Sequence, residues 1–107
     1  MSLSKGRDET PVLIRPPDVI GDGSKDVTSA GTAEQLTDTD TPCKFVNIFA
    51  KAGNTGNVFV GGVNVSSSRG MVLEQARSTD WMQIDNLNKI YVDVATGGDG
   101  VQYAYVV

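Results

Sequence analysis

Residues 88–95 read NKIYVDVA, and their apolar side chains recur at every second position. Ile90, Val92 and Val94 therefore share one face of an extended chain, and the residues between them share the other. A repeat of two is typical of a β-strand that buries one face, whereas a helix repeats about every 3.6 residues. The same alternation runs through 43–50 (CKFVNIFA) and 101–107 (VQYAYVV). These three segments predict a β-rich fold.

The chain after residue 25 has the same character throughout, with short β-favouring runs separated by clusters of Gly, Asn, Asp and Ser. The clusters at 85–88 and 97–100 contain residues that tolerate the positive φ that hairpins need. No segment of ten residues has a convincing helical repeat. We predict strands at 26–30, 33–37, 43–50, 56–61, 63–66, 70–75, 79–85, 88–95 and 101–107. They predict an all-β, antiparallel β-sandwich of jelly-roll or Greek-key type, with residues 26–107 as its body.

Residues 1–25 differ from this body and are predicted to form an extended N-terminal arm. A short aliphatic run is enclosed by Pro11 on one side and by Pro16 and Pro17 on the other. Proline disfavours both a helix and a central strand, and it holds the preceding residue extended. We expect the arm to pack on its own body or, alternatively, against a neighbouring subunit, because a disordered tail would be more polar. Its aliphatic residues are Val12, Leu13, Ile14, Val19 and Ile20.

The overall composition argues against several classes of partner. The net charge is -4, the isoelectric point is about 4.5, and the nine Lys and Arg are scattered singly. Nucleic-acid binders normally carry a basic patch, so neither nucleic acid nor an anionic membrane is an expected partner. The charged N-terminus lacks the apolar segment of a secretory signal, and no apolar run approaches the length of a membrane span.

The sequence also offers little for catalysis. It contains no histidine and a single cysteine, Cys43. These counts exclude a disulfide within the chain, a Ser-His-Asp or Cys-His arrangement, and most zinc sites. We therefore expect no enzymatic activity, no metal and no cofactor.

Three features of the sequence could suggest a site, but each has a simpler interpretation. The glycines of 53–62 lack the Gly-Lys-Ser/Thr sequence and the helix of a phosphate loop, and they predict turns around a strand. Asp38 and Asp40 could give two oxygens to calcium, but solvated loop residues are the simpler interpretation. Cys43 precedes an apolar strand without an electropositive setting, which predicts a buried structural thiol.

Three aromatic residues leave more possibilities open. Phe45 and Phe49 lie on the face of strand 43–50 opposite Val46 and Ile48, and Trp81 precedes a further strand. If the strand is buried on both faces, all three aromatic residues belong to the core, which is the commoner case. Otherwise they are candidates for a protein interface or for a platform on which a sugar stacks.

The size of the body favours association with other chains. A β-rich body of this length buries only about 60% of its unfolded surface, which leaves little margin of stability. Small scaffolds are usually reinforced by disulfides, metals or oligomerisation, and the composition disfavours the first two. We therefore expect a homo-oligomer or attachment to a larger scaffold.

Four stretches together resemble the small virion proteins encoded among the head genes of tailed bacteriophages. They read AGTAEQL at 30–36, PCKFVNI at 42–48, GNTGNVFVGGVNVSSSRG at 53–70, and DNLNKIYVDV at 85–94. The resemblance covers roughly residues 28–106 and leaves the arm outside. The proteins of this family are decoration (cement) or head-fibre proteins with a β-rich body on the outer capsid. The matching residues set turns and strands, and no functional residue is carried over from the family.

The resemblance implies a structural virion protein that stabilises or decorates the outer capsid surface. Its expected partners are the major capsid protein and further copies of itself, with a trimer as the favoured homo-oligomer. The protein would be made in the host cytoplasm and would end on the virion. The alternative is a head-fibre or tail-associated module that binds a carbohydrate receptor.

Overall fold

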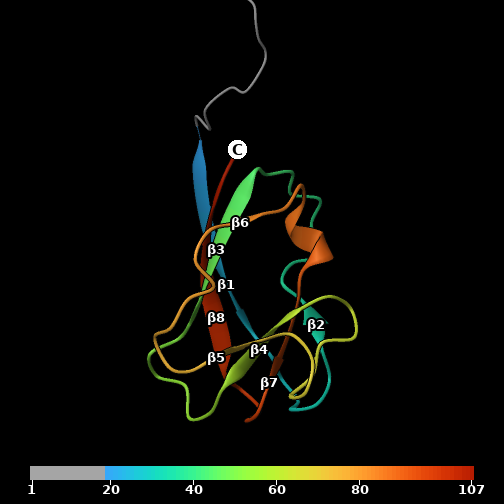
Figure 1. Ribbon diagram of the computed structural model, residues 1–107, viewed down its shortest axis with the longest axis vertical. Coiled ribbons are helices and arrows are strands. Elements are labelled where there is room, and N and C mark those ends of the chain that lie inside the picture. Colours follow the sequence, from blue (N-terminus) through green and yellow to red (C-terminus); the bar gives the residue numbers. More distant parts are fainter. Residues whose placement is uncertain (1–18) are drawn as a thin grey trace, which may run out of the picture.

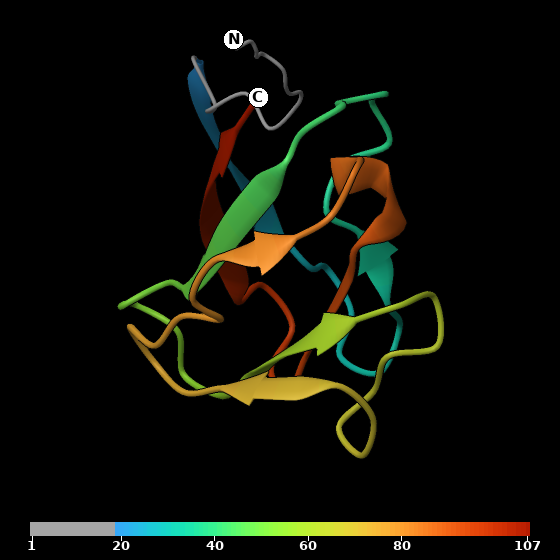
Figure 2. The same ribbon diagram turned by 45° about the horizontal axis from the view of Figure 1, so that its top comes forward.

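The computed structural model describes residues 19–107, which fold into two antiparallel sheets of four strands each. The sheets face one another in a β-sandwich-like arrangement, which can be followed in Figures 1 and 2. Within this part of the chain the only helical element is the 3-10 turn Leu87–Lys89. The predicted all-β, antiparallel architecture is confirmed.

One sheet, which we call sheet A, contains the first and last strands of the described chain. β8 lies between β1 and β3, and it pairs along its full length with β1. β3 pairs on its other side with the short strand β6. The order across sheet A is β1 (Ile20–Asp26), β8 (Gly100–Val106), β3 (Phe45–Ala50) and β6 (Met82–Gln83).

The other sheet, sheet B, is built from shorter strands. β4 and β5 form a hairpin in which Val60 pairs with Met71, and β7 pairs with the opposite side of β4. The order across sheet B is β2 (Glu34–Gln35), β7 (Tyr91–Val94), β4 (Val58–Gly61) and β5 (Met71–Leu73).

The core lies between the two sheets and is filled by the alternating apolar positions of the sequence. Val46, Ile48 and Ala50 of β3 are buried, as the period of two predicts. Val92 and Val94 of β7 face them from the other sheet and are also buried. Burying an aliphatic side chain of this size stabilises the fold by about 1.5–3 kcal/mol.

Strand β1 depends on the side chains of its neighbour. Its sequence, IGDGSKD, has little intrinsic preference for a strand. Gly21 lies directly opposite Tyr105, and Gly23 lies opposite Tyr103. A Cβ at either glycine would overlap the opposing ring, so each tyrosine occupies the space above a glycine. Such cross-strand aromatic cover is known to compensate for glycine at a sheet edge.

The boundary between arm and body is earlier than the sequence indicated. Residues 20–25, which were assigned to the arm, belong to β1. The expected strand 26–30 is wrong, because the chain leaves the sheet after Asp26 and Thr32 N–H donates to the carbonyl of Ser29 in a turn. The arm before Val19 lies outside the described residues.

Two further strand predictions need correction. Residues 63–66 are part of the loop of the β4–β5 hairpin, where Val65 N–H donates to the carbonyl of Gly62 at 2.9 Å. The expected strand 88–95 begins only at Tyr91, because Leu87–Lys89 forms the 3-10 turn. The Asn86 side chain accepts from Asn88 N–H at the start of that turn and so favours it over extended chain.

Candidate protein-interaction surface

The outer face of sheet A carries large apolar side chains that remain partly exposed to solvent. Ile20, Val106 and Phe45 form a row across β1, β8 and β3, because each pairs with the next in the ladder. Ile20 is 70% exposed and Phe45 is 37% exposed. We call the surface formed by Ile20, Phe45, Phe49, Trp81 and Val106 the outer face of sheet A.

Trp81 extends this surface beyond the edge of β3. It is 51% exposed, and together with Phe45 and Val106 it lines a shallow hollow. The surface that lines the hollow is apolar, so the hollow itself offers no hydrogen-bonding group to a ligand. This composition suits an apolar side chain of a partner better than a hydroxylated molecule.

Phe49 lies four residues further along β3, opposite Gln102 of β8. It is 40% exposed and lines a second hollow with Ala52, Ala76 and Ala104. Along a strand, four residues correspond to about 13 Å. The outer face therefore has two separate places where a partner's side chain can dock.

The interpretation of Phe45, Phe49 and Trp81 as core residues is wrong. They lie on the side of β3 and β6 that faces away from sheet B, and this side has no second layer. On sheet B, by contrast, Phe59 is buried although its neighbours Val58 and Val60 face the core. The two sheets thus differ in how far their outer sides are covered.

Asn47 lies between Phe45 and Phe49 on β3 but is buried and does not belong to the exposed surface. Its Oδ1 atom has no hydrogen-bond donor among the described residues. A buried acceptor without a partner costs about 1–3 kcal/mol.

The polar part of the same side lies at the far end of β1. Asp26 forms an ion pair with Lys51, with 2.7 Å between Oδ1 and Nζ, and Asp22 and Ser24 are exposed. Polar residues beside an apolar centre are the usual composition of a protein interface. The surface therefore resembles one side of an interface in its composition.

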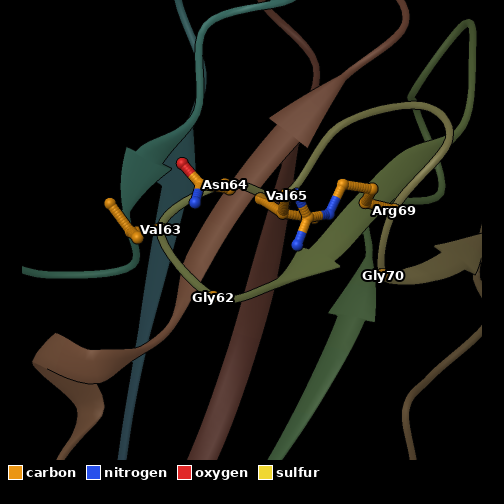
Figure 3. Close-up of a pocket in the computed structure, with 6 residues that line it drawn as sticks. All are labelled: Gly62, Val63, Asn64, Val65, Arg69 and Gly70. Atoms are coloured by element: carbon orange, nitrogen blue, oxygen red, sulfur yellow. The ribbon is translucent and has the colours of Figure 1, made fainter.

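A further hollow lies beneath the loop of the β4–β5 hairpin (Figure 3). It is lined by backbone and side chains of residues 62–65 with Arg69 and Gly70. Arg69 is its only charged side chain, and it contains no carboxylate or thiol. The hollow lacks the pair of interacting groups that acid–base or nucleophilic catalysis needs.

Cys43 has the structural role that the sequence predicted. The thiol is buried, and its Sγ donates to the carbonyl oxygen of Ile84 at 3.2 Å. Burial raises the pKa of the Cys43 thiol, and the nearby Asp85 carboxylate raises it further. Both effects disfavour the thiolate, which is the reactive form.

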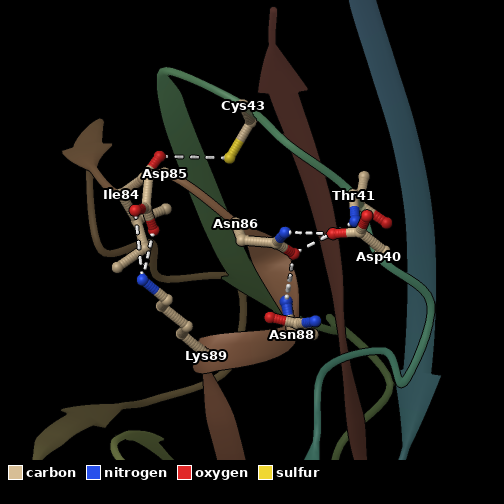
Figure 4. A network of polar contacts seen from close by, with 8 residues as sticks. All are labelled: Asp40, Thr41, Cys43, Ile84, Asp85, Asn86, Asn88 and Lys89. Carbon is tan, nitrogen blue, oxygen red and sulfur yellow. Dashed lines mark hydrogen bonds and ion pairs between the residues drawn. The ribbon is translucent and has the colours of Figure 1, made fainter.

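The polar network next to Cys43 fastens two loops together (Figure 4). Asn86 Oδ1 accepts from the backbone N–H of Thr41 at 3.0 Å, and Asn86 Nδ2 donates to Asp40. Lys89 pairs with Asp85 at 2.8 Å, and this bond lowers the pKa of the Asp85 carboxyl. The Asp40 carboxylate therefore takes part in a hydrogen bond that joins these two loops.

Residues 53–57 lead into β4, a turn follows that strand, and no helix comes after it, as the predicted turns around a strand require. Residues 19–107 contain no group of three His, Cys, Asp or Glu that could hold a metal ion. In the same residues no helix is long and apolar enough to cross a membrane.

The structure brings together four of the eight interface residues that the sequence suggested. Ile20, Phe45, Phe49 and Trp81 lie on the outer face of sheet A, and Val19 is exposed next to Ile20. Val12, Leu13 and Ile14 lie outside the described residues. The sequence interpretation missed one member of the surface, Val106. The alternation in 101–107 gave a signal for Val106, because it placed this residue opposite the tyrosines.

Comparison with protein-family models, with curated proteins and with solved structures found no match for this chain.

Proposed function

We propose that this chain is a non-enzymatic structural protein of a tailed-phage virion that decorates the outer surface of the capsid. The observation that carries the proposal is the uncovered apolar outer face of sheet A. Exposed aromatic side chains gathered at one place mark a surface that another protein covers. A protein whose work is mechanical needs such a surface and no catalytic group.

We further infer that the fold is a jelly roll. Support comes from the strand orders β1-β8-β3-β6 and β2-β7-β4-β5. In each sheet a strand from the beginning of the chain lies beside one from its end: β1 lies beside β8, and β2 lies beside β7. This order arises when one long antiparallel pair of chain segments folds over into two sheets with Greek-key connections. Viral capsid domains and lectins both use the jelly roll, so the fold is compatible with the two candidate functions.

The proposed partners are the major capsid protein and further copies of this chain. A particle presents the same binding surface many times, so weak contacts of single copies add up when the copies are also linked to each other. We expect a homo-oligomer, with a trimer as the simplest state at a local threefold axis. The proposed location is the outer capsid surface, after synthesis in the host cytoplasm.

The test is co-sedimentation of the full chain with capsids that lack it. Saturable binding is expected, and it should weaken in a chain that starts at Val19. A start at Asp26 is unsuitable, because it would remove β1 and uncover Tyr103 and Tyr105. Circular dichroism of the shortened chain verifies its fold. Absence of binding by the folded full chain would reject the decoration role.

A carbohydrate-binding module of a head fibre or tail is the second candidate. The exposed ring of Trp81 beside Phe45 favours it, because sugars stack on aromatic faces. The apolar lining of the hollow counts against it, because sugar sites also hold hydrogen-bonding groups. A glycan array with the full chain and with Trp81→Ala tests this: Trp81-dependent binding to one class of glycan would favour the module.

A further inference from the structure

We propose that the outer face of sheet A binds the aliphatic segment Val12–Ile14 of a second copy of this chain. The inference rests on the proposed function, since it describes how copies join in an assembly, and it names the two surfaces that meet. The receiving surface is the hollow formed by Phe45, Trp81 and Val106 together with the neighbouring side chain of Ile20.

The receiving surface has the exposed, adjacent apolar side chains that are typical of one side of a protein interface. Three of its large side chains are between 37% and 70% exposed, although they lie next to one another. Its hollow is lined by apolar atoms of Phe45, Trp81 and Val106. An aliphatic side chain placed there would remove apolar surface of both partners from water, which is the main favourable term in association.

The chain itself carries a matching segment close to this surface. Val12, Leu13 and Ile14 are consecutive aliphatic residues in the 18 residues that precede the described part. That part begins at Val19, whose carbonyl accepts from Val107 N–H at 2.8 Å beside β8. The segment therefore joins the body at the same end of sheet A as the hollow, where Ile20 and Val106 pair.

The sequence between the segment and β1 favours an extended, stiff connection. Arg15 and Pro16 both precede a proline, so extended backbone is favoured at both positions. The two prolines fix φ, and five residues at about 3.1 Å each separate Ile14 from Val19 by about 16 Å. A stiff connection of this length favours contact of Val12–Ile14 with a neighbouring copy over a return to its own sheet.

Charge favours an arm over a second body as the occupant. Residues 19–107 contain ten of the 13 acidic side chains but only six of the nine basic ones. Residues 1–18 contain three of each and are neutral. Two bodies that docked face to face would repel one another, whereas a neutral segment approaches the acidic body without that cost.

The experiment uses two full-length variants that each lose one of the two surfaces. The arm variant is V12D/L13D/I14D, and the face variant is Trp81→Glu. Val72→Glu is the matched control, because Val72 is 55% exposed but lies on β5 of sheet B. Circular dichroism verifies the fold of each chain, and sedimentation velocity over a range of concentrations measures association.

We expect the wild type and Val72→Glu to self-associate with equal affinity, and each of the other variants to associate at least tenfold more weakly. Mixing the arm variant with the face variant should then restore a one-to-one complex. The protein has one tryptophan, and the face variant lacks it. Tryptophan emission of the mixture therefore reports only on the face of the arm variant, and it should shift to the blue on mixing.

Other outcomes overturn the inference. If the arm variant still associates and the face variant does not, two faces bind each other. If the wild type is monomeric and the arm substitutions alone shift Trp81 emission to the red, the arm covers its own body. If no variant differs from the wild type, neither surface is involved. None of these measurements uses capsids, so they leave the proposed function to be decided by co-sedimentation.

Discussion

The ring of Tyr105 lies over Gly21, its partner across the β1–β8 ladder, in the space that a side chain at Gly21 would need. Tyr105 and Tyr103 also pack against the core from this position. Strand β1 is therefore held by side chains that belong to β8. The sequence of β1 alone would not favour it.

Gly21→Val should destabilise the fold by about 1–3 kcal/mol, although valine favours strands, because the new side chain displaces the Tyr105 ring. Ser24→Val is the control, since Ser24 is exposed on the same strand. It should be neutral or slightly stabilising. Urea unfolding measures both values. Equal effects of the two substitutions would mean that the ring contact is unimportant.

Glu34 should stabilise the fold in a pH-dependent way. Lys25 of β1 donates to Glu34 of β2 at 2.8 Å and thereby joins sheet A to sheet B. This bond and the donation from Thr28 N–H lower the pKa of the Glu34 carboxyl below its usual value of 4.5. A lowered pKa means that the stabilisation is complete above pH 4.5 and disappears as the pH falls through the folded-state pKa.

The measurement compares wild type with Glu34→Gln by urea unfolding between pH 7 and pH 2.5. The variant should be less stable by about 1 kcal/mol or less at pH 7, since the pair is partly exposed. The two chains should converge at the acid end of the range. A difference that grows as the pH falls would contradict this assignment.

Asp99 should be important for the loop at 53–56. Its buried carboxylate accepts from Thr55 N–H at 3.1 Å and from Gly56 N–H at 2.9 Å. Asp99→Ala leaves two N–H groups without a partner and should cost about 1–3 kcal/mol. Asp38→Ala, at an exposed loop carboxylate, should cost much less. Hydrogen exchange at Thr55 and Gly56 provides a local readout, and unchanged protection in Asp99→Ala would be inconsistent with this role.

The thiol of Cys43 should react slowly in the folded protein. Burial and the bond to Ile84 both protect it, and the raised pKa lowers the thiolate fraction at pH 7 to 8. Labelling with a coloured disulfide reagent should be slow in buffer and fast in denaturant. Rapid labelling of the folded chain would show that the segment around Ile84, which contacts the thiol, opens easily.

Asn47→Val should leave the isolated chain unchanged or stabilise it by about 1–3 kcal/mol. The substitution removes a buried Oδ1 without a donor and introduces a residue that favours strands. Thermal unfolding at low protein concentration measures this effect. A clear loss of stability would indicate that Asn47 has a partner that compensates its burial.

The sequence was informative where a segment alternates between a buried and an open side. The period of two placed Val46 and Ile48 together on one face of their strand, and this face lies in the core. The same pattern could not tell whether the opposite side of β3 is covered, because that depends on a second layer distant in sequence. For this reason the sequence could name Phe45 and Phe49 as candidate interface residues but could not decide whether they lie in the core or on the surface.

The missed elements are those whose cause lies elsewhere in the chain. β1 could not be recognised from IGDGSKD, because its stability comes from the rings of Tyr103 and Tyr105, some 80 residues later. Residues 63–66 have strand-like alternation, but the pairing of Val60 with Met71 leaves them in a loop. In both cases the partner strand decides the conformation.

The glycine–tyrosine ladder of β1 and β8 also has a mechanical consequence. A pull on the residues before Val19 acts along the axis of β1, because the chain continues directly into that strand. If the rest of the body is held in place, the load is a shear force that the seven paired residues of β1 bear together. The rings of Tyr103 and Tyr105 would have to slide past Gly21 and Gly23 before the strand yields. An arm joined in this way can transmit tension between linked copies and resist extraction better than one attached at a strand that peels open pair by pair.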